Sequence, residues 1–213
     1  MTSPVAPSLS LSLPRGLLAF TCGYMAAAGA GAWITGNREF IFYGVVMLVL
    51  LIGVWRVHRR TGLTPGLLWM LSIWGLLHMA GGLVPVPAGW PYEPPNAVLY
   101  SWWVIPMRLK YDQLIHVYGF GVTTWLCWQA LRASVRGPDG RELRPTTGLL
   151  VLSAAGGMGF GALNEVIEFA ATLTMPHTNV GGYVNTGWDL VSNLVGCALA
   201  AVIIRWHAGR RAP

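Results

Sequence analysis

Six apolar runs, each close to the length of a membrane-crossing helix, constrain this chain more than any other feature. About 20 apolar residues of helix cross the roughly 30 Å hydrocarbon core of a bilayer. Backbone in lipid must satisfy its own hydrogen bonds, as helix or closed barrel, and the alternating strands of a barrel are absent. We therefore predict an all-α polytopic membrane protein, a six-transmembrane-helix bundle forming one integral membrane domain over residues 1–213. Its spans are expected at about 17–35, 40–57, 65–84, 111–131, 147–173 and 188–206.

The charged residues are few and unevenly placed. They make up only 10% of the chain, whereas soluble proteins carry about 25%. Most of the basic residues flank alternate runs, which by the positive-inside rule puts both termini in the cytoplasm; these residues are Arg15, Arg56, Arg59, Arg60, Arg132, Arg136, Arg141, Arg144, Arg205, Arg210 and Arg211. The expected location is the bacterial inner (cytoplasmic) membrane, multi-pass. The net charge of +6 thus follows topology, and no basic stripe with interleaved aromatics predicts a nucleic-acid partner.

Two segments leave alternatives open. The first run contains Cys22, Tyr24 and Met25 and is long for a signal sequence, so we expect a retained helix rather than a cleaved signal peptide. The segment 85–110 is rich in proline and tryptophan, which prevents one continuous helix and favours the membrane interface. It is either a partial lid on the outer surface or a membrane-hugging linker with no role in a site.

Four carboxylates lie in, or at the mouths of, the apolar runs. A charged side chain at the centre of a membrane helix costs about 3 kcal/mol on insertion scales. Such residues persist where they face a protein interior, a water-filled cavity or a partner. The carboxylates are Asp112, Glu165, Glu168 and Asp189, and the polar residues near them are His78, His116, Asn164 and Asn193.

The spacing of these residues predicts one shared pocket. Asp112 and His116, Glu165 and Glu168, and Asp189 and Asn193 are pairs one helical turn apart, so each pair shares a helix face. With the predicted topology and 1.5 Å per residue, all of them fall within about 10–12 Å of the outer boundary. We therefore expect an outward-facing acidic/His pocket, also lined by His78, Asn164 and Asn193.

Three arrangements would relieve the repulsion among these carboxylates. A divalent cation could bind, some carboxyls could be protonated as in a proton relay, or Arg108 and Lys110 could act as counter-ions. Mixed carboxylate and imidazole ligands suit zinc, manganese or iron. The predicted metal ligands are Asp112, His116, Glu165 and Asp189, with Glu165 and Glu168 as catalytic carboxylates.

Three motifs resemble those of a known group of proteins. They are D-x-x-x-H at 112–116, E-x-x-E at 165–168 and W-D-x-x-x-N-x-x-G at 188–196. In this order they resemble the YjdF-like bacterial inner-membrane proteins and, more distantly, the VanZ-like family of small helical membrane proteins linked to glycopeptide-antibiotic resistance. The resemblance covers about residues 111–205. It implies that Asp112, His116, Glu165, Glu168, Asp189 and Asn193 are family-type positions, but it supplies no reaction.

Three functions remain from these observations. The first is metal-assisted hydrolysis or transfer on a lipid or cell-envelope precursor, because the predicted depth matches the outer-leaflet headgroups. The alternative is a binding or transport protein in which the carboxylates handle protons or cations. The second alternative is a structural membrane scaffold with an internal ion-pair network. In each case membrane lipid is the expected surrounding partner.

Overall fold

The computed structural model describes residues 12–210 except 136, 138, 139 and 141. Both chain ends and Arg136, Arg141 and Arg211 of the topology argument therefore lie outside the described residues. Six long helices make up most of the fold. They are α1 (Arg15–Ile34), α2 (Arg38–Thr61), α3 (Pro65–Leu83), α4 (Tyr111–Ser134), α5 (Thr147–Thr174) and α6 (Tyr183–Gly209).

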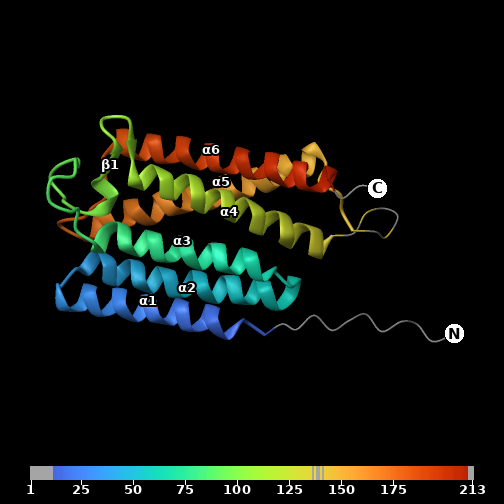
Figure 1. Ribbon diagram of the computed structural model, residues 1–213, viewed down its shortest axis with the longest axis horizontal. Helices are drawn as coiled ribbons and strands as arrows, with labels where there is room; N and C mark the ends of the chain where they lie inside the picture. Colours follow the sequence, from blue (N-terminus) through green and yellow to red (C-terminus); the bar gives the residue numbers. More distant parts are fainter. Residues whose placement is uncertain (1–11, 136, 138–139, 141, 211–213) are drawn as a thin grey trace.

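The helices run alternately up and down, so that the start of α1 and the end of α6 lie at the same end of the bundle (Figure 1). Five of the six, all except α4, are long and apolar enough to cross a membrane by length and composition. We call the opposite end, which carries the segment 84–110 and the α5–α6 connection, the loop end. Helix α6 begins at Tyr183, earlier than the span predicted from Trp188.

Helix α4 is the centre of the bundle. It packs most extensively against α6 and α5, and it also contacts α3 and α2. Its buried face includes Gln113, His116, Thr123 and Thr124. A helix that is surrounded by protein can carry polar residues that lipid would not accept, which explains why α4 has no stretch apolar enough to count among the five candidate spans.

Glycines bring α4, α5 and α6 close together. A Cβ atom on Gly196 of α6 would overlap the carbonyl oxygen of Val117 in α4, and one on Gly157 of α5 would overlap the Thr124 hydroxyl. A Cβ atom on Gly161 would lie 2.7 Å from the amide nitrogen of Asn193. These small residues therefore let α5 and α6 approach α4 and each other closely.

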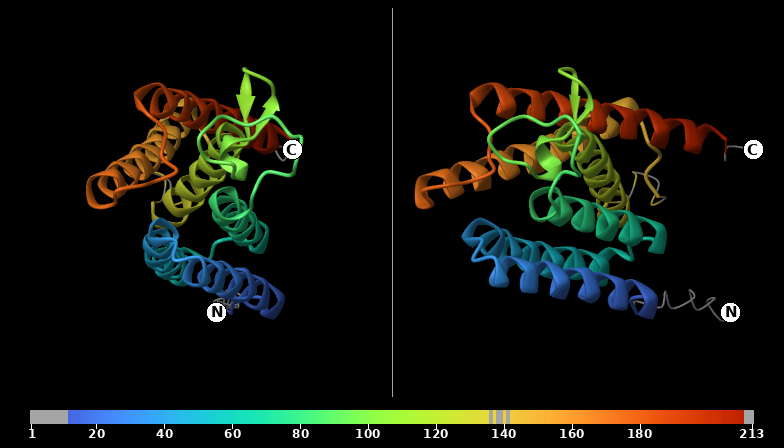
Figure 2. Two further views of the ribbon diagram at one scale, coloured as in Figure 1. Left: turned by 90° about the vertical axis from the view of Figure 1, so that its left-hand side faces the viewer. Right: turned by 60° about the vertical axis from the view of Figure 1, so that its left-hand side comes forward.

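The segment between α3 and α4 is not helical along its length, as its prolines predicted. It contains a short 3-10 helix, η1 (Leu99–Ser101), and two strands, β1 (Trp103–Ile105) and β2 (Leu109–Lys110), which pair antiparallel. This small hairpin and two isolated bridges, Pro85 with Val98 and Tyr92 with Trp102, depart from the all-α prediction. Figure 2 (left) looks onto the loop end, where the segment lies across the ends of α3 and α4.

Candidate functional site

The polar residues of α4, α5 and α6 meet inside the loop end of the bundle. We call this group the acidic/His cluster: Asp112 and His116 of α4, Asn164, Glu165 and Glu168 of α5, and Asp189 and Asn193 of α6. His116, Asp189 and Asn193 are 3%, 1% and 0% exposed. The polar face predicted for each helix therefore does turn toward the protein interior.

His116 lies at the centre of the cluster. Its Nδ1 is hydrogen-bonded to Asn193 Oδ1 at 2.9 Å and lies 3.8 Å from Glu165 Oε1. Its Nε2 lies 3.6 Å from Asp112 Oδ1, one turn earlier on the same helix. The imidazole thus touches all three helices of the cluster, one through each contact.

Two overlapping sets of side chains could hold a metal ion. One set is Asp112, His116 and Asp189, and the other is His116, Glu165 and Glu168. Within each set, one nitrogen or oxygen ligand atom per residue can be chosen so that all lie within 4.8 Å of one another. The four predicted metal ligands and the two predicted catalytic carboxylates are therefore divided between the two sets, with His116 in common.

Several oxygen atoms of the cluster are left without a partner. Neither carboxylate oxygen of Glu165 has a hydrogen-bond partner of normal geometry among the described residues, and the same is true of Asp189 Oδ1. The other oxygen of Asp189 accepts a bond from Asn185 Nδ2 at 2.6 Å, and Glu168 accepts one from Asn164 Nδ2 at 2.8 Å. Buried polar atoms are normally satisfied, so these open acceptors are available to a cation, a proton or a water molecule.

Arg108 and Lys110, the two predicted counter-ions, form no ion pair with the carboxylates of the cluster. Lys110 is buried, but its Nζ is paired with Glu93 Oε2 at 2.9 Å and bonded to Asn185 Oδ1. Asn185 therefore stands between Lys110 and Asp189. Over the described part of the chain, no lysine or arginine is ion-paired with any of the four carboxylates.

A further polar contact beside the cluster, between Glu39 and Asn179, was not predicted from the sequence. Glu39 of α2 is 5% exposed and accepts three hydrogen bonds from Asn179 in the α5–α6 connection, two from its backbone nitrogen and one from its side chain. Glu39 precedes Tyr43 by one turn, so the same i, i+4 rule that found Asp112 and His116 could have found it. This contact joins the start of α2 to the connection that leads into α6.

Two neighbouring spaces, which share lining residues, lie beside the cluster. A cavity of about 20 Å³, enough for about one water molecule, is lined by Tyr43, His78, Tyr100, Asp112 and Glu168, among others. A larger vestibule of about 610 Å³ opens at the loop end and shares Asp112 and Tyr100 with the cavity. His78 lines the cavity and does not join either metal-ligand set.

Tyr100 connects the segment 84–110 to this cavity. Its hydroxyl donates to the carbonyl oxygen of His78 at 2.7 Å. Burial, and then the nearby Asp112 carboxylate, raise the pKa of the Tyr100 hydroxyl well above its usual range. It therefore stays protonated as a donor, and its bond to His78 O ties the segment 84–110 to α3.

The fold and the site together define a multi-pass helical membrane protein with an acidic/His cluster inside the bundle. The chain belongs to the predicted membrane protein family DUF2238, whose family model matches residues 16–210. None of the curated proteins and none of the solved structures matches the chain.

Proposed function

We propose that the acidic/His cluster is a divalent metal site that supports hydrolysis or transfer on a lipid or cell-envelope precursor. The observation that carries this proposal is the unbalanced charge of the cluster. Asp112, Glu165, Glu168 and Asp189 converge on His116, and no described lysine or arginine is ion-paired with them. A divalent cation relieves the repulsion of buried carboxylates and satisfies their open oxygen atoms.

The hydrogen bond from His116 favours one of the two ligand sets. When Nδ1 donates to Asn193 Oδ1, the other ring nitrogen, Nε2, keeps its lone pair and faces Asp112. Histidines that bind metals commonly donate their second N–H to an oxygen in this way. We therefore assign Asp112, His116 Nε2 and the open Oδ1 of Asp189 as the primary ligands. Zinc, manganese and iron are the ions that suit this mixture of imidazole and carboxylate.

The two glutamates of α5 are then free for proton transfer. Glu165 approaches the ring from the Nδ1 side and has two unpartnered oxygens, so it can accept a proton from water or a substrate hydroxyl. Glu168 is held by Asn164 and faces the 20 Å³ cavity, which is large enough for that water. A cation held by Asp112, His116 and Asp189 would supply the acidity for that water and the polarisation of an ester or phosphoryl oxygen.

The proposal also includes the topology. All six helices cross the bacterial inner membrane, both termini are cytoplasmic, and the loop end faces outward with segment 85–110 as a partial lid. The central position of α4 supports a sixth span, because its polar face is covered by protein. Arg56, Arg60 and Arg132 lie at or near the ends of α2 and α4 opposite the loop end, as the positive-inside rule requires. The YjdF-like and VanZ-like resemblances remain predictions.

Elemental analysis of purified protein tests the metal. After reconstitution with zinc, manganese or iron and removal of free ion, the native chain should keep a stoichiometric amount of metal, and the Asp112→Ala plus Glu165→Ala variant should lose it. Glu142→Gln, at the opposite end of the bundle, is the matched carboxylate control and should keep it. Absence of stoichiometric metal from the native chain after all three reconstitutions contradicts the metal proposal.

A proton- or cation-coupled transport protein is the second candidate. The unpartnered oxygens of Glu165 and the contact of Glu168 with the cavity support it, because a carboxyl that carries a proton needs no fixed cation. A transport assay distinguishes this candidate from the first. It predicts pH-dependent uptake into proteoliposomes without turnover of a substrate.

A further inference from the structure

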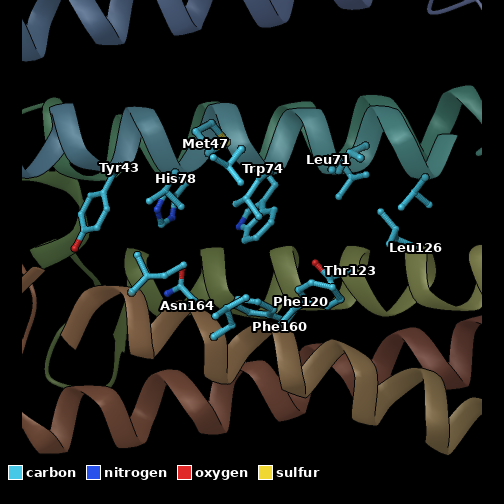
Figure 3. A pocket seen from close by; sticks show the side chains of 18 of the residues that line it. Tyr43, Met47, Leu71, Trp74, His78, Phe120, Thr123, Leu126, Phe160 and Asn164 are labelled. Carbon is cyan, nitrogen blue, oxygen red and sulfur yellow. The ribbon is translucent and has the colours of Figure 1, made fainter. Parts of the chain in front are cut away.

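A lateral groove runs along the bundle between α2 and α5, beside the acidic/His cluster. Its volume is about 360 Å³, which is within the range of small-molecule sites. Helices α3 and α4 form its floor, and α2 and α5 do not pack extensively against each other across it. Figure 3 shows Trp74, Phe120 and Phe160 meeting in its middle, with Leu71 and Leu126 toward the end away from the cluster.

The groove is polar at one end only. Tyr43, His78 and Glu168 line both the groove and the 20 Å³ cavity, and the cavity in turn shares Asp112 with the vestibule. Thr123 lies near the apolar end. Its hydroxyl donates a hydrogen bond to Gly119 O of the same helix at 2.8 Å, so its proton is already satisfied. The groove, the cavity and the vestibule therefore form a series that passes from apolar to acidic to solvent-facing.

The surroundings of the groove indicate what fills it. Its walls belong to helices apolar enough to cross a membrane, so hydrocarbon is the medium outside. Water would find few polar partners there, and an empty groove would forfeit dispersion contacts along its walls. The groove follows α2 from Tyr43 to Val57, about 21 Å at 1.5 Å per residue. That length is most of the roughly 30 Å hydrocarbon core of a bilayer.

We propose that the groove holds one hydrocarbon chain of an amphiphilic lipid, with its polar head in the vestibule and the junction between them at the acidic/His cluster. The charged side chains that line the vestibule are Glu93, Arg108, Lys110 and Asp112. Lys110 is paired with Glu93, whereas Arg108 is not ion-paired with any residue in the described part of the chain. The unpaired guanidinium of Arg108 is therefore available to bind the phosphate of an anionic head. The inference rests on the proposed function for the chemistry at the junction, whereas binding of the chain itself needs no metal.

Photolabelling maps the chain directly. The protein is reconstituted into vesicles of phosphatidylethanolamine and phosphatidylglycerol that contain a phosphatidylglycerol with a diazirine in one acyl chain. After irradiation, label should concentrate in the α2 and α5 peptides that carry Leu50 and Leu163, above the level on the outward-facing residues of α1. This map uses the native chain and needs no substitution.

One glycine allows the groove to be filled without disturbing the fold. Gly53 lines the groove, and a Cβ atom there meets nothing within 4 Å. Gly53→Phe should therefore remove the concentrated label. Gly23→Phe is the matched control, because Gly23 is an exposed glycine of α1 that also has nothing within 4 Å and does not line the groove; its labelling should equal that of the native chain.

Three results would overturn the inference. The first is label spread evenly over all lipid-facing helices of the native chain. The second is equal groove labelling in the native chain and in a folded Gly53→Phe variant. The third is a cross-link between the α2 groove residues of two copies, which would identify a second copy of this chain as the occupant. The Asp112→Ala plus Glu165→Ala variant separates the two proposals, because it should lose metal but keep the groove label.

Discussion

Replacing Asn193 by leucine tests whether this amide prepares His116 for a metal. Asn193 is 0% exposed, and its Oδ1 is the partner of His116 Nδ1 at 2.9 Å. Leucine has a similar volume but no acceptor, so the imidazole N–H is left unpaired. A buried donor without its partner costs about 1–3 kcal/mol. Losing the outer partner of a ligating histidine weakens metal binding about 10- to 100-fold, which is about 1.4–2.8 kcal/mol.

The assay is a titration of the purified, metal-free protein with zinc in a chelator buffer, which yields the Kd. Ser192→Ala is the matched control on the same helix. Ser192 is also buried, but its hydroxyl donates to Trp188 O one turn earlier and does not touch the cluster. Its Kd should equal that of the native chain. A folded Asn193→Leu protein with the native Kd would refute the assignment of Nε2 as the metal ligand.

Three further predictions follow from the same contacts. Zinc at about 100 times its Kd should stabilise the native chain by about 2.7 kcal/mol, seen as a higher unfolding temperature that a chelator reverses; an unchanged temperature contradicts a folded-state site. Gly196→Ala should destabilise the bundle by about 1–3 kcal/mol in thermal unfolding, because the new methyl group meets Val117 O. Gly187→Ala is its control and should be neutral or stabilising, because a Cβ atom there meets nothing within 4 Å. If the protein transports protons or cations, Glu168→Gln should abolish pH-dependent uptake into proteoliposomes, and unchanged flux removes that candidate.

The helices could be predicted because each rests on local information. Long apolar runs and the need to satisfy backbone groups in lipid determine where helices form. Most boundaries agree to within a few residues. The largest difference is α6, which begins at Tyr183. The added turn includes Asn185, whose side chain bonds Asp189 one turn later and also Lys110, 75 residues away in the sequence. A local hydropathy pattern does not show such a distant partner.

The content of the site could also be predicted in large part. The pairs 112/116, 165/168 and 189/193 are each one turn apart, and a polar stripe in an apolar helix has to face inward. What could not be predicted is which atoms meet. That His116 bonds Asn193, that Lys110 is taken by Glu93, and that Glu39 bonds Asn179 all depend on helix rotation and on loop paths. The spacing of residues along the sequence specifies neither the rotation of each helix nor the path of each loop.

For this protein, the sequence alone determined a multi-helix membrane chain with acidic and histidine side chains facing its interior, because hydrocarbon excludes unpaired charge and unpaired backbone. Only the tertiary structure decided that α4 is the central helix, that two ligand sets share His116, and that an apolar groove between α2 and α5 reaches the same cluster. Those features arise from how closely helices approach one another. That approach is decided by packing between residues far apart in the chain, such as Gly196 against Val117.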